Sequence, residues 1–161
     1  MNKDYLVMIL KCIVMICLLV KFIPKNKIRE ANVAFFFMQG LSWVQGLIVA
    51  EVSLIEYPVR CFPHATKTSF PFEYFVLPSI CAIFNVLYPK GKSSFGKFMY
   101  YFYYCSAITI LEIFVEKYMN ILKYMHWTWY VTWITVFISL YVSRRYYEWF
   151  FNVKQNKNSI A

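Results

Sequence analysis

Carboxylates set inside long apolar runs are the residues whose type and position best suit chemistry in this chain. Glu112 lies about fifteen residues into the run that begins at Lys97, or roughly 22 Å along a helix at a rise of about 1.5 Å per residue. Glu51 sits comparably deep in the run 31–55. Because an ionised carboxylate inside a bilayer costs a few kcal/mol, such residues face other helices or water and usually mark function. We therefore predict that Glu51 and Glu112 face the interior of a helical bundle or a partner.

Helical spacing predicts two polar helix faces. Glu112 and Glu116 share one face with Cys105 and Thr109, because the intervals between these residues match successive helical turns. The next apolar run carries a hydroxyl stripe made of Thr128, Thr132, Thr135, Ser139 and Ser143. If the two faces meet, Glu116 and His126 lie at similar depth near the outer surface, where a Glu–His pair binds a cation or relays a proton. The alternative is structural, because hydroxyl stripes are most often packing surfaces and His126 also fits an interfacial helix start.

An enzyme needs a nucleophile or a metal site, and the chain offers little of either. Its histidines are His64 and His126, which together with Glu56 and Glu116 would be the ligands of an outer-face metal-dependent hydrolase. The sequence contains no H-E-x-x-H, G-x-S-x-G or paired aspartates. Its five cysteines form no C-x-x-C pair and mostly lie in apolar runs, which indicates small hydrophobic residues and no disulfide framework. We predict no cofactor. The candidate site is an intramembrane or outer-face set of polar residues, namely Glu51, Glu56, Glu112, Glu116 and His126.

The elements that must position these groups are membrane-spanning helices. Of the 161 residues, 60% are hydrophobic and 22% aromatic, whereas 16% are charged, which is too few to coat a soluble globule. A net charge of +9 suits either a nucleic-acid binder or a membrane protein. Here the basic residues punctuate long apolar runs and form no patch. We therefore predict an all-α integral membrane protein of the cell membrane that contacts the lipid bilayer and no nucleic acid.

The apolar runs predict about five transmembrane helices, at about 5–23, 31–55, 72–88, 97–118 and 126–151. Residues 1–151 then form a single transmembrane domain, and residues 152–161 form a polar cytoplasmic tail that we expect to be disordered. The first run begins like a signal peptide, but Lys11 interrupts it and no small-residue cleavage site follows, so we expect it to be retained. Pro78 should kink the third helix, and a neighbouring helix should satisfy the carbonyl that the proline leaves free.

Basic residues in short loops set the orientation of a membrane protein, because they resist translocation. The side that includes the C-terminus holds Lys21, Lys25, Lys27, Arg29, Lys90, Lys92, Lys97, Arg144, Arg145, Lys154 and Lys157. The other side holds Lys3, Arg60, Lys67, Lys117 and Lys123. We therefore expect a cytoplasmic C-terminus, and an odd number of spans then places the N-terminus outside.

Several segments resemble those of a known family. They are 56–60 (EYPVR), 73–75 (EYF), 116–118 (EKY), 127–130 (WTWY) and 147–151 (YEWFF). The chain resembles, over most of its length, an uncharacterised family of small integral membrane proteins found mostly in endospore-forming Gram-positive bacteria, and 116–129 is the most specific stretch. The resemblance implies a multipass protein of the bacterial plasma membrane. It implies no activity and no catalytic residues.

Three functions are compatible with these patterns. The first is a non-enzymatic membrane protein that acts by helix packing with a membrane-protein partner or as a homo-oligomer. A ridge of small residues (Ser42, Gly46 and Ala50) and the hydroxyl stripe favour it, because small and polar side chains hold helices together in lipid. The second is a small ion or proton pathway through the outer-leaflet carboxylates Glu51 and Glu112, with Glu116. The third is the metal-dependent membrane enzyme.

Overall fold

Long helices that run back and forth along one axis account for most of the chain. In the computed structural model, which describes residues 3–62 and 64–151, they are α1 (Lys3–Phe22), α2 (Ile28–Glu51), α3 (Leu77–Val86), α4 (Ser94–Tyr118) and α5 (Trp129–Phe150). A 3-10 turn η1 (Lys25–Lys27) precedes α2, and a wide π-helical turn η2 (Phe72–Val76) precedes α3. Two short strands, β1 (Ile55–Glu56) and β2 (Lys123–Tyr124), pair antiparallel. The described chain is thus mostly helical, as predicted. The predicted tail 152–161 lies outside the described residues.

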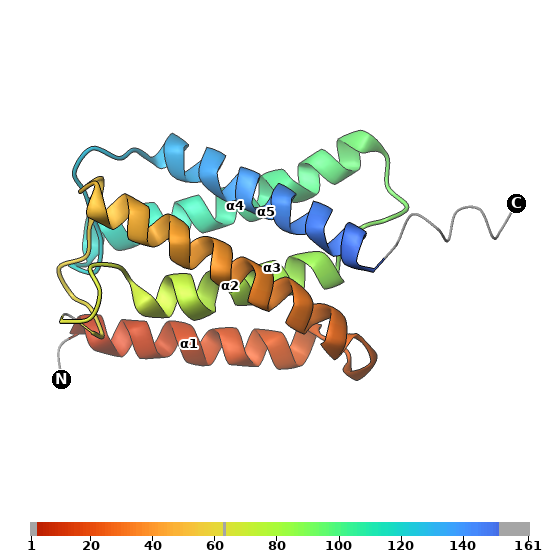
Figure 1. Ribbon diagram of the computed structural model, residues 1–161, viewed down its shortest axis with the longest axis horizontal. Helices are drawn as coiled ribbons and strands as arrows, with labels where there is room; N and C mark the ends of the chain where they lie inside the picture. The colour runs from red at the N-terminus through yellow and green to blue at the C-terminus, as the bar shows by residue number, and fades with distance from the viewer. Residues whose placement is uncertain (1–2, 63, 152–161) are drawn as a thin grey trace, which may run out of the picture.

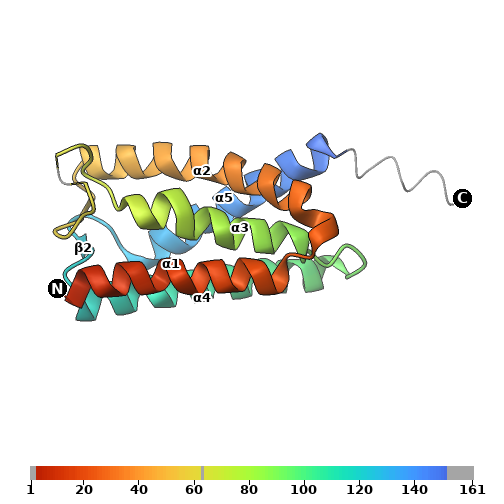
Figure 2. The same cartoon turned by 90° about the horizontal axis from the view of Figure 1, so that it is seen from below.

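Successive helices alternate in direction, so the connecting segments gather at two ends of the bundle (Figure 1). Segments 23–27 and 87–93 lie at the end where α5 finishes, which we call the basic end. Segments 52–62, 64–71 and 119–128 lie at the end where α1 begins, which we call the loop end. In both views α3 lies beside α2, and α1 runs along the outside of the bundle (Figures 1 and 2). The two groups of loops are therefore separated by the full length of the helices.

The helix α2 ends earlier than the apolar run from which it was predicted. The run continues to Ile55, but Ser53 adopts a left-handed conformation with φ of 54° and stops the helix at Glu51. The amide of Leu54 then donates to the Val49 carbonyl at 3.0 Å, which is the bond that closes a helix C-terminus of this kind. Likewise α5 begins at Trp129 and not at residue 126, because residues 123–126 pair with the segment after α2.

One of the two consequences predicted for Pro78, a free carbonyl that a neighbouring helix satisfies, is confirmed. A proline has no N–H, so the carbonyl four residues earlier, that of Tyr74, loses its helical donor. The side chain of Gln39 on α2 donates to this carbonyl at 2.9 Å. The wide turn η2 lies immediately before the proline, and the Leu77 amide bonds to the Phe72 carbonyl across it. A neighbouring helix thus replaces the missing bond, as a bundle in lipid requires.

Three helical segments are long and apolar enough to cross a membrane within the part of the chain that the structure describes. They are 4–22, Lys25–Glu51 and Ser94–Tyr118. The apolar helix Phe72–Val86 is shorter, and α5 carries three charged residues near its end, Arg144, Arg145 and Glu148. Around this frame α1 exposes a broad apolar surface that includes Ile9, Ile13 and Val20. Such a surface suits contact with lipid.

The core lies where α2, α3, α4 and α5 meet. The side chains of Met38, Phe84, Cys105 and Leu140 are completely buried there, one from each helix. Tyrosines of α4 surround Phe84, and Tyr101 lies 4.9 Å from it between ring centroids. This apolar layer fills the middle of the bundle and separates polar clusters that lie toward its two ends.

Candidate functional site: a buried carboxylate–tyrosine cluster

Glu112 is held by hydroxyl groups at the loop end of the bundle. Its Oε1 accepts hydrogen bonds from the Tyr124 hydroxyl and the Thr132 hydroxyl, each at 2.7 Å. The indole Nε1 of Trp127 donates in turn to Thr132 Oγ1 at 2.7 Å. Lys11 of α1 lies near enough to interact electrostatically with Glu112. The prediction that Glu112 faces the interior of the bundle is confirmed.

The loop end is organised by the pairing of two loops far apart in sequence. Ile55 pairs with Tyr124 and Glu56 with Lys123 in the two-stranded sheet. The Leu54 carbonyl accepts from the amides of residues 125 and 126 at 3.1 and 3.2 Å. This pairing ties the segment after α2 to the segment after α4. It thereby brings together Tyr57, the residue after β1, and Tyr124, the last residue of β2.

Glu73 is the most deeply buried carboxylate at this end, and it was not among the predicted site residues. Its side chain comes from η2, and the residue is 4% exposed. The Tyr57 hydroxyl donates to Oε1 at 3.3 Å. The buried hydroxyl of Thr68 lies nearby, yet Oε2 has no hydrogen-bond partner within the described residues. A buried carboxylate oxygen without a partner is rare, because it loses its hydration without compensation.

The position of Glu73 depends on small residues of α2. A Cβ added at Gly46 would fall on the carboxylate of Glu73, so only glycine leaves room for it. One turn earlier the Ser42 hydroxyl donates to the Glu73 main-chain carbonyl at 2.6 Å. The small-residue ridge is therefore a packing surface, as predicted, but it packs inside this chain. The sequence signal that could have identified Glu73 is a carboxylate inside the apolar run 72–88, five residues before Pro78.

Tyr57 donates a hydrogen bond to Glu73 and is also close enough to Glu112 to feel its charge. Burial raises the pKa of its hydroxyl well above the usual value, and the neighbouring Glu73 and Glu112 raise that pKa further. Burial and Glu112 likewise raise the pKa of Tyr124. Both tyrosines are therefore neutral donors at any physiological pH. We call Glu73, Tyr57, Glu112 and Tyr124 the carboxylate–tyrosine cluster.

The remaining predicted site residues lie at the surface of the loop end. Glu51 does not face the interior of the bundle, contrary to the prediction. It is the last residue of α2, its side chain is 72% exposed, and it pairs with Lys67 at 2.9 Å. It was expected to lie deep in the membrane because the apolar run continues past it, whereas the helix does not. Glu56 is exposed opposite Lys123 on the strand pair.

Glu116 and His126 do not form the Glu–His pair that was predicted from their similar depth. Glu116 lies one turn beyond Glu112 and is partly exposed, and His126 is exposed after β2. No hydrogen bond joins their side chains in the described part of the chain. Nor do residues 3–62 and 64–151 contain three His, Cys, Asp or Glu side chains grouped as metal ligands. The proposed metal-dependent hydrolase thus has no ligand set among them.

A second polar cluster lies near the basic end. Arg144, which the charge count placed among the basic residues of the cytoplasmic side, is 2% exposed and lies inside the bundle. Its Nε donates to Glu148 Oε1 at 3.1 Å, and its guanidinium lies 4.0 Å from the centre of the Tyr88 ring. Close by, Ser143 of the hydroxyl stripe bonds to Cys81 and Asn85 of α3. This cluster joins α3 to α5.

The hydroxyl stripe of α5 points mainly into the bundle. Thr132, Ser139 and Ser143 are buried, and Ser139 donates to Gln45 of α2 at 3.0 Å. Thr135 and Ser139 also bond back to carbonyls of their own helix. The structural interpretation of the stripe therefore accounts for most of its members.

Comparisons of the chain with known protein families, with curated proteins and with solved structures find no match.

Proposed function

We propose that the chain is a multipass integral protein of the cell membrane that crosses it about five times, with the loop end outside and the basic end in the cytoplasm. Support comes from the alternation of the helices, which collects the most basic loops at one end (Figure 1). Arg144 is buried and paired, but the excess of lysine and arginine at the basic end persists without it. The resemblance to small membrane proteins of Gram-positive bacteria supports the bacterial plasma membrane as the location.

A natural cysteine makes this topology testable. Cys61 is exposed in segment 52–62, at the loop end. Partial burial of its sulfur raises the pKa of this thiol, so the thiolate fraction, and with it the rate of labelling, should be higher at pH 9 than at pH 7. We expect a membrane-impermeant maleimide to label Cys61 in intact cells, and the Cys61→Ser variant to lose that label. Labelling that requires broken cells would reverse the proposed orientation.

We further propose that the carboxylate–tyrosine cluster reversibly binds a proton from the outer side. The observation that carries this proposal is Glu73, a 4% exposed carboxylate with one oxygen unpartnered among the described residues. Keeping such a group ionised in a membrane bundle costs several kcal/mol, and a bound proton removes that cost. The chemistry is therefore a protonation equilibrium that reports the pH at the loop end. This develops the proton alternative, which was centred on Glu51, Glu112 and Glu116. It keeps Glu112 and adds Glu73 as the group that takes up the proton.

A proton fits the cluster better than a metal cation does. The tyrosine and threonine hydroxyls donate their hydrogens to the carboxylates, whereas a hard cation needs oxygen acceptors that converge on it. Below the cluster, the buried layer of Phe84 and Leu140 closes the middle of the bundle. A proton bound at Glu73 in this conformation returns to the outer side, so the proposed activity is proton binding and not open conduction.

Infrared spectroscopy of the protein in liposomes tests the proposal, because a protonated carboxyl has a C=O band distinct from a carboxylate. We expect a pH-dependent carboxyl band in the wild type that Glu73→Gln removes. Glu51→Gln is the matched control, because Glu51 lies at the same end but is exposed and paired with Lys67. A wild-type spectrum that does not change with pH, or a band that Glu73→Gln leaves in place, would overturn the proposal.

Helix packing with a partner or with a second copy stays a prediction. The small-residue ridge and most of the hydroxyl stripe are used inside the chain. Association would therefore have to use the apolar outer surfaces, such as that of α1.

A further inference from the structure

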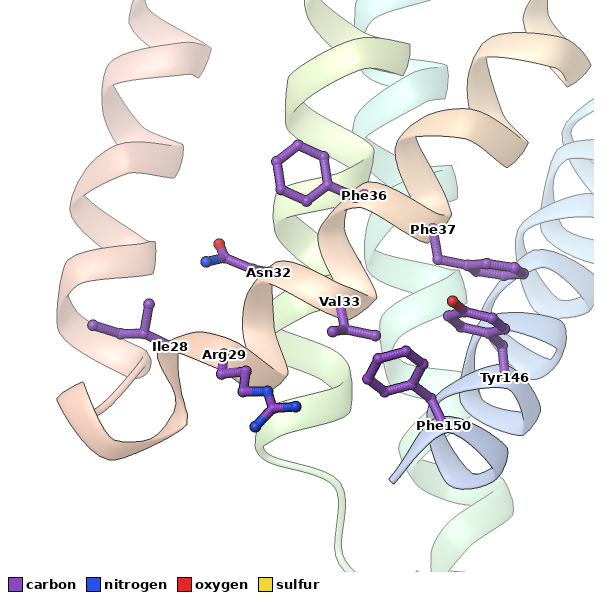
Figure 3. A pocket seen from close by; sticks show the side chains of 8 residues that line it. All are labelled: Ile28, Arg29, Asn32, Val33, Phe36, Phe37, Tyr146 and Phe150. Atoms are coloured by element: carbon purple, nitrogen blue, oxygen red, sulfur yellow. The ribbon is translucent and has the colours of Figure 1, made fainter. Parts of the chain in front are cut away.

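An aromatic cleft of about 630 Å³ lies between α2 and α5 near the basic end (Figure 3). Its lining residues come from the first ten residues of α2 and the last five of α5, which lie at the end that the proposed orientation puts at the cytoplasmic surface of the membrane. Its volume is in the range of small-molecule sites. No part of the proposed function uses it.

The cleft is built from rows of residues four apart on the two helices. One row of α2 is Ile28, Asn32 and Phe36, and the next is Arg29, Val33 and Phe37. The α5 side is Tyr146 and Phe150. Phe37 and Tyr146 stack face to face, with ring centroids 4.1 Å apart, and close the cleft between the helices (Figure 3). The rows extend over about two turns of α2, so the lining runs from the basic end toward the middle of the bundle.

Polarity changes along these rows from one end to the other. Arg29 is in the first turn of α2, and Asn32 is one turn deeper. Beyond them the lining is apolar, and Phe36 is 65% exposed. No carboxylate lies within 4 Å of Arg29 within the described residues, and the nearby Glu30 instead accepts from the Tyr147 hydroxyl. Lys25, one turn before Arg29, is also exposed. The cleft thus offers a free cation at its mouth and an apolar surface below it.

We propose that this cleft binds an anionic phospholipid of the leaflet at the basic end. The phosphate lies against Arg29, whose planar guanidinium suits two hydrogen bonds to phosphate oxygens, and Asn32 adds an amide donor. An acyl chain follows Val33 and Phe36 toward the middle of the membrane. Basic pockets between transmembrane helices on the cytoplasmic side are typical sites for anionic head groups. The inference depends on the bundle spanning a bilayer and is independent of proton binding at the other end.

The charge of the cleft mouth favours a lipid over a second copy of the chain. A second copy in the same membrane orientation would bring an equally basic end to the cleft, because Arg29, Lys25 and Lys27 repeat in it. Like charges brought together repel, whereas an anionic head group neutralises them. The amphiphilic pattern of the lining also matches a molecule with a charged end and an apolar tail.

Native mass spectrometry of the full chain in detergent, with phosphatidylglycerol or phosphatidylcholine added, tests this inference. We expect the wild type to retain phosphatidylglycerol in preference to phosphatidylcholine. Arg29→Gln should weaken phosphatidylglycerol binding at least about tenfold, which is the loss expected for a charge-assisted contact. Arg29→Lys should have an intermediate effect, because it keeps the charge but loses the paired geometry. The matched control is Lys90→Gln, an exposed charge at the same end but outside the cleft, which should bind like the wild type.

Several results would overturn the proposal. Equal weakening by Arg29→Gln and Lys90→Gln would indicate diffuse surface charge. If millimolar inorganic phosphate displaces bound phosphatidylglycerol as effectively as added phosphatidylglycerol does, the site binds anions without using its apolar lining. A stable dimer that Phe36→Ala dissociates would assign the cleft to a second copy. Because Arg29 is exposed, the unfolding temperature of Arg29→Gln in zwitterionic detergent should match that of the wild type, which separates a binding defect from misfolding.

Discussion

Replacing Gly46 with alanine puts a methyl group where the Glu73 carboxylate lies. The carboxylate is the mobile end of its side chain, so it can move, but it then leaves the Tyr57 hydroxyl and its buried site. The substitution is therefore expected to act on stability through Glu73, although residue 46 carries no polar group.

Three contributions set the size of the effect. Loss of the Tyr57 hydrogen bond costs about 0.5–3 kcal/mol, depending on the charge of the carboxyl. Crowding an extra methyl group into a packed interior costs about 1–3 kcal/mol. Against these, alanine favours a helix over glycine by about 1 kcal/mol. The net expectation is a destabilisation of between about 0.5 and 5 kcal/mol, which in a chain of this size lowers the unfolding temperature by between about 1 and 20 °C.

The assay is thermal unfolding of the detergent-solubilised protein, followed by its tryptophan fluorescence. Gly40→Ala is the matched control, because Gly40 lies in the same helix and a Cβ there meets nothing within 4 Å. It should be neutral or raise stability by up to about 1 kcal/mol. The decisive comparison is Gly46→Ala in a Glu73→Ala background. With the carboxylate gone, the same methyl group should be neutral or stabilising.

The reasoning fails if Gly46→Ala lowers the unfolding temperature equally with and without Glu73. Contacting residues should show a coupling free energy above about 0.5 kcal/mol in this double-mutant cycle. A smaller coupling would mean that the carboxylate does not lie over Gly46 in the membrane protein.

Other substitutions test the remaining features by the same unfolding assay. Ser53→Gly should raise stability by about 1 kcal/mol, because glycine adopts the left-handed conformation at the end of α2 without strain; a loss of stability would contradict that helix end. Arg144→Ala should cost about 1.5–3 kcal/mol, because it removes a buried guanidinium and its hydrogen bond to the partly exposed Glu148, whereas Arg145→Ala, with a side chain 58% exposed, should cost less than about 1 kcal/mol. Equal effects of the two would contradict the burial of Arg144. Glu51→Gln should change stability by less than about 1 kcal/mol, since its ion pair with Lys67 is exposed to solvent. A larger loss would indicate that the Glu51 side chain is buried.

Properties that belong to single helices were predictable from the sequence. The length of each apolar run located the ends of the helices to within about three residues, apart from the end of α2, which comes four residues early, and the start of α3, where the turn η2 occupies residues 72–76. Helical periodicity predicted that Glu112 lies on a polar face of one helix and the hydroxyl stripe on a face of the next, and that these faces could meet. Thr132 of the stripe does donate a hydrogen bond to Glu112. The absence of an N–H at Pro78 predicted a free carbonyl that a neighbour must satisfy, and Gln39 satisfies it. Each of these conclusions follows from local geometry, which does not depend on how the helices are arranged.

The cluster at the loop end was decided by tertiary structure. Apolar character continues past Glu51, so the sequence could not show that Ser53 would end the helix and leave this carboxylate in solvent. Glu73 is buried because α2 presents Gly46 to it and because the strand pair brings Tyr57 over it. Arg144 is buried because Tyr88 and Glu148 enclose it in the rotation that α5 adopts against α3. Burial of a charged side chain depends on which faces of separate helices meet, and that rotation is set by packing between segments far apart in the chain.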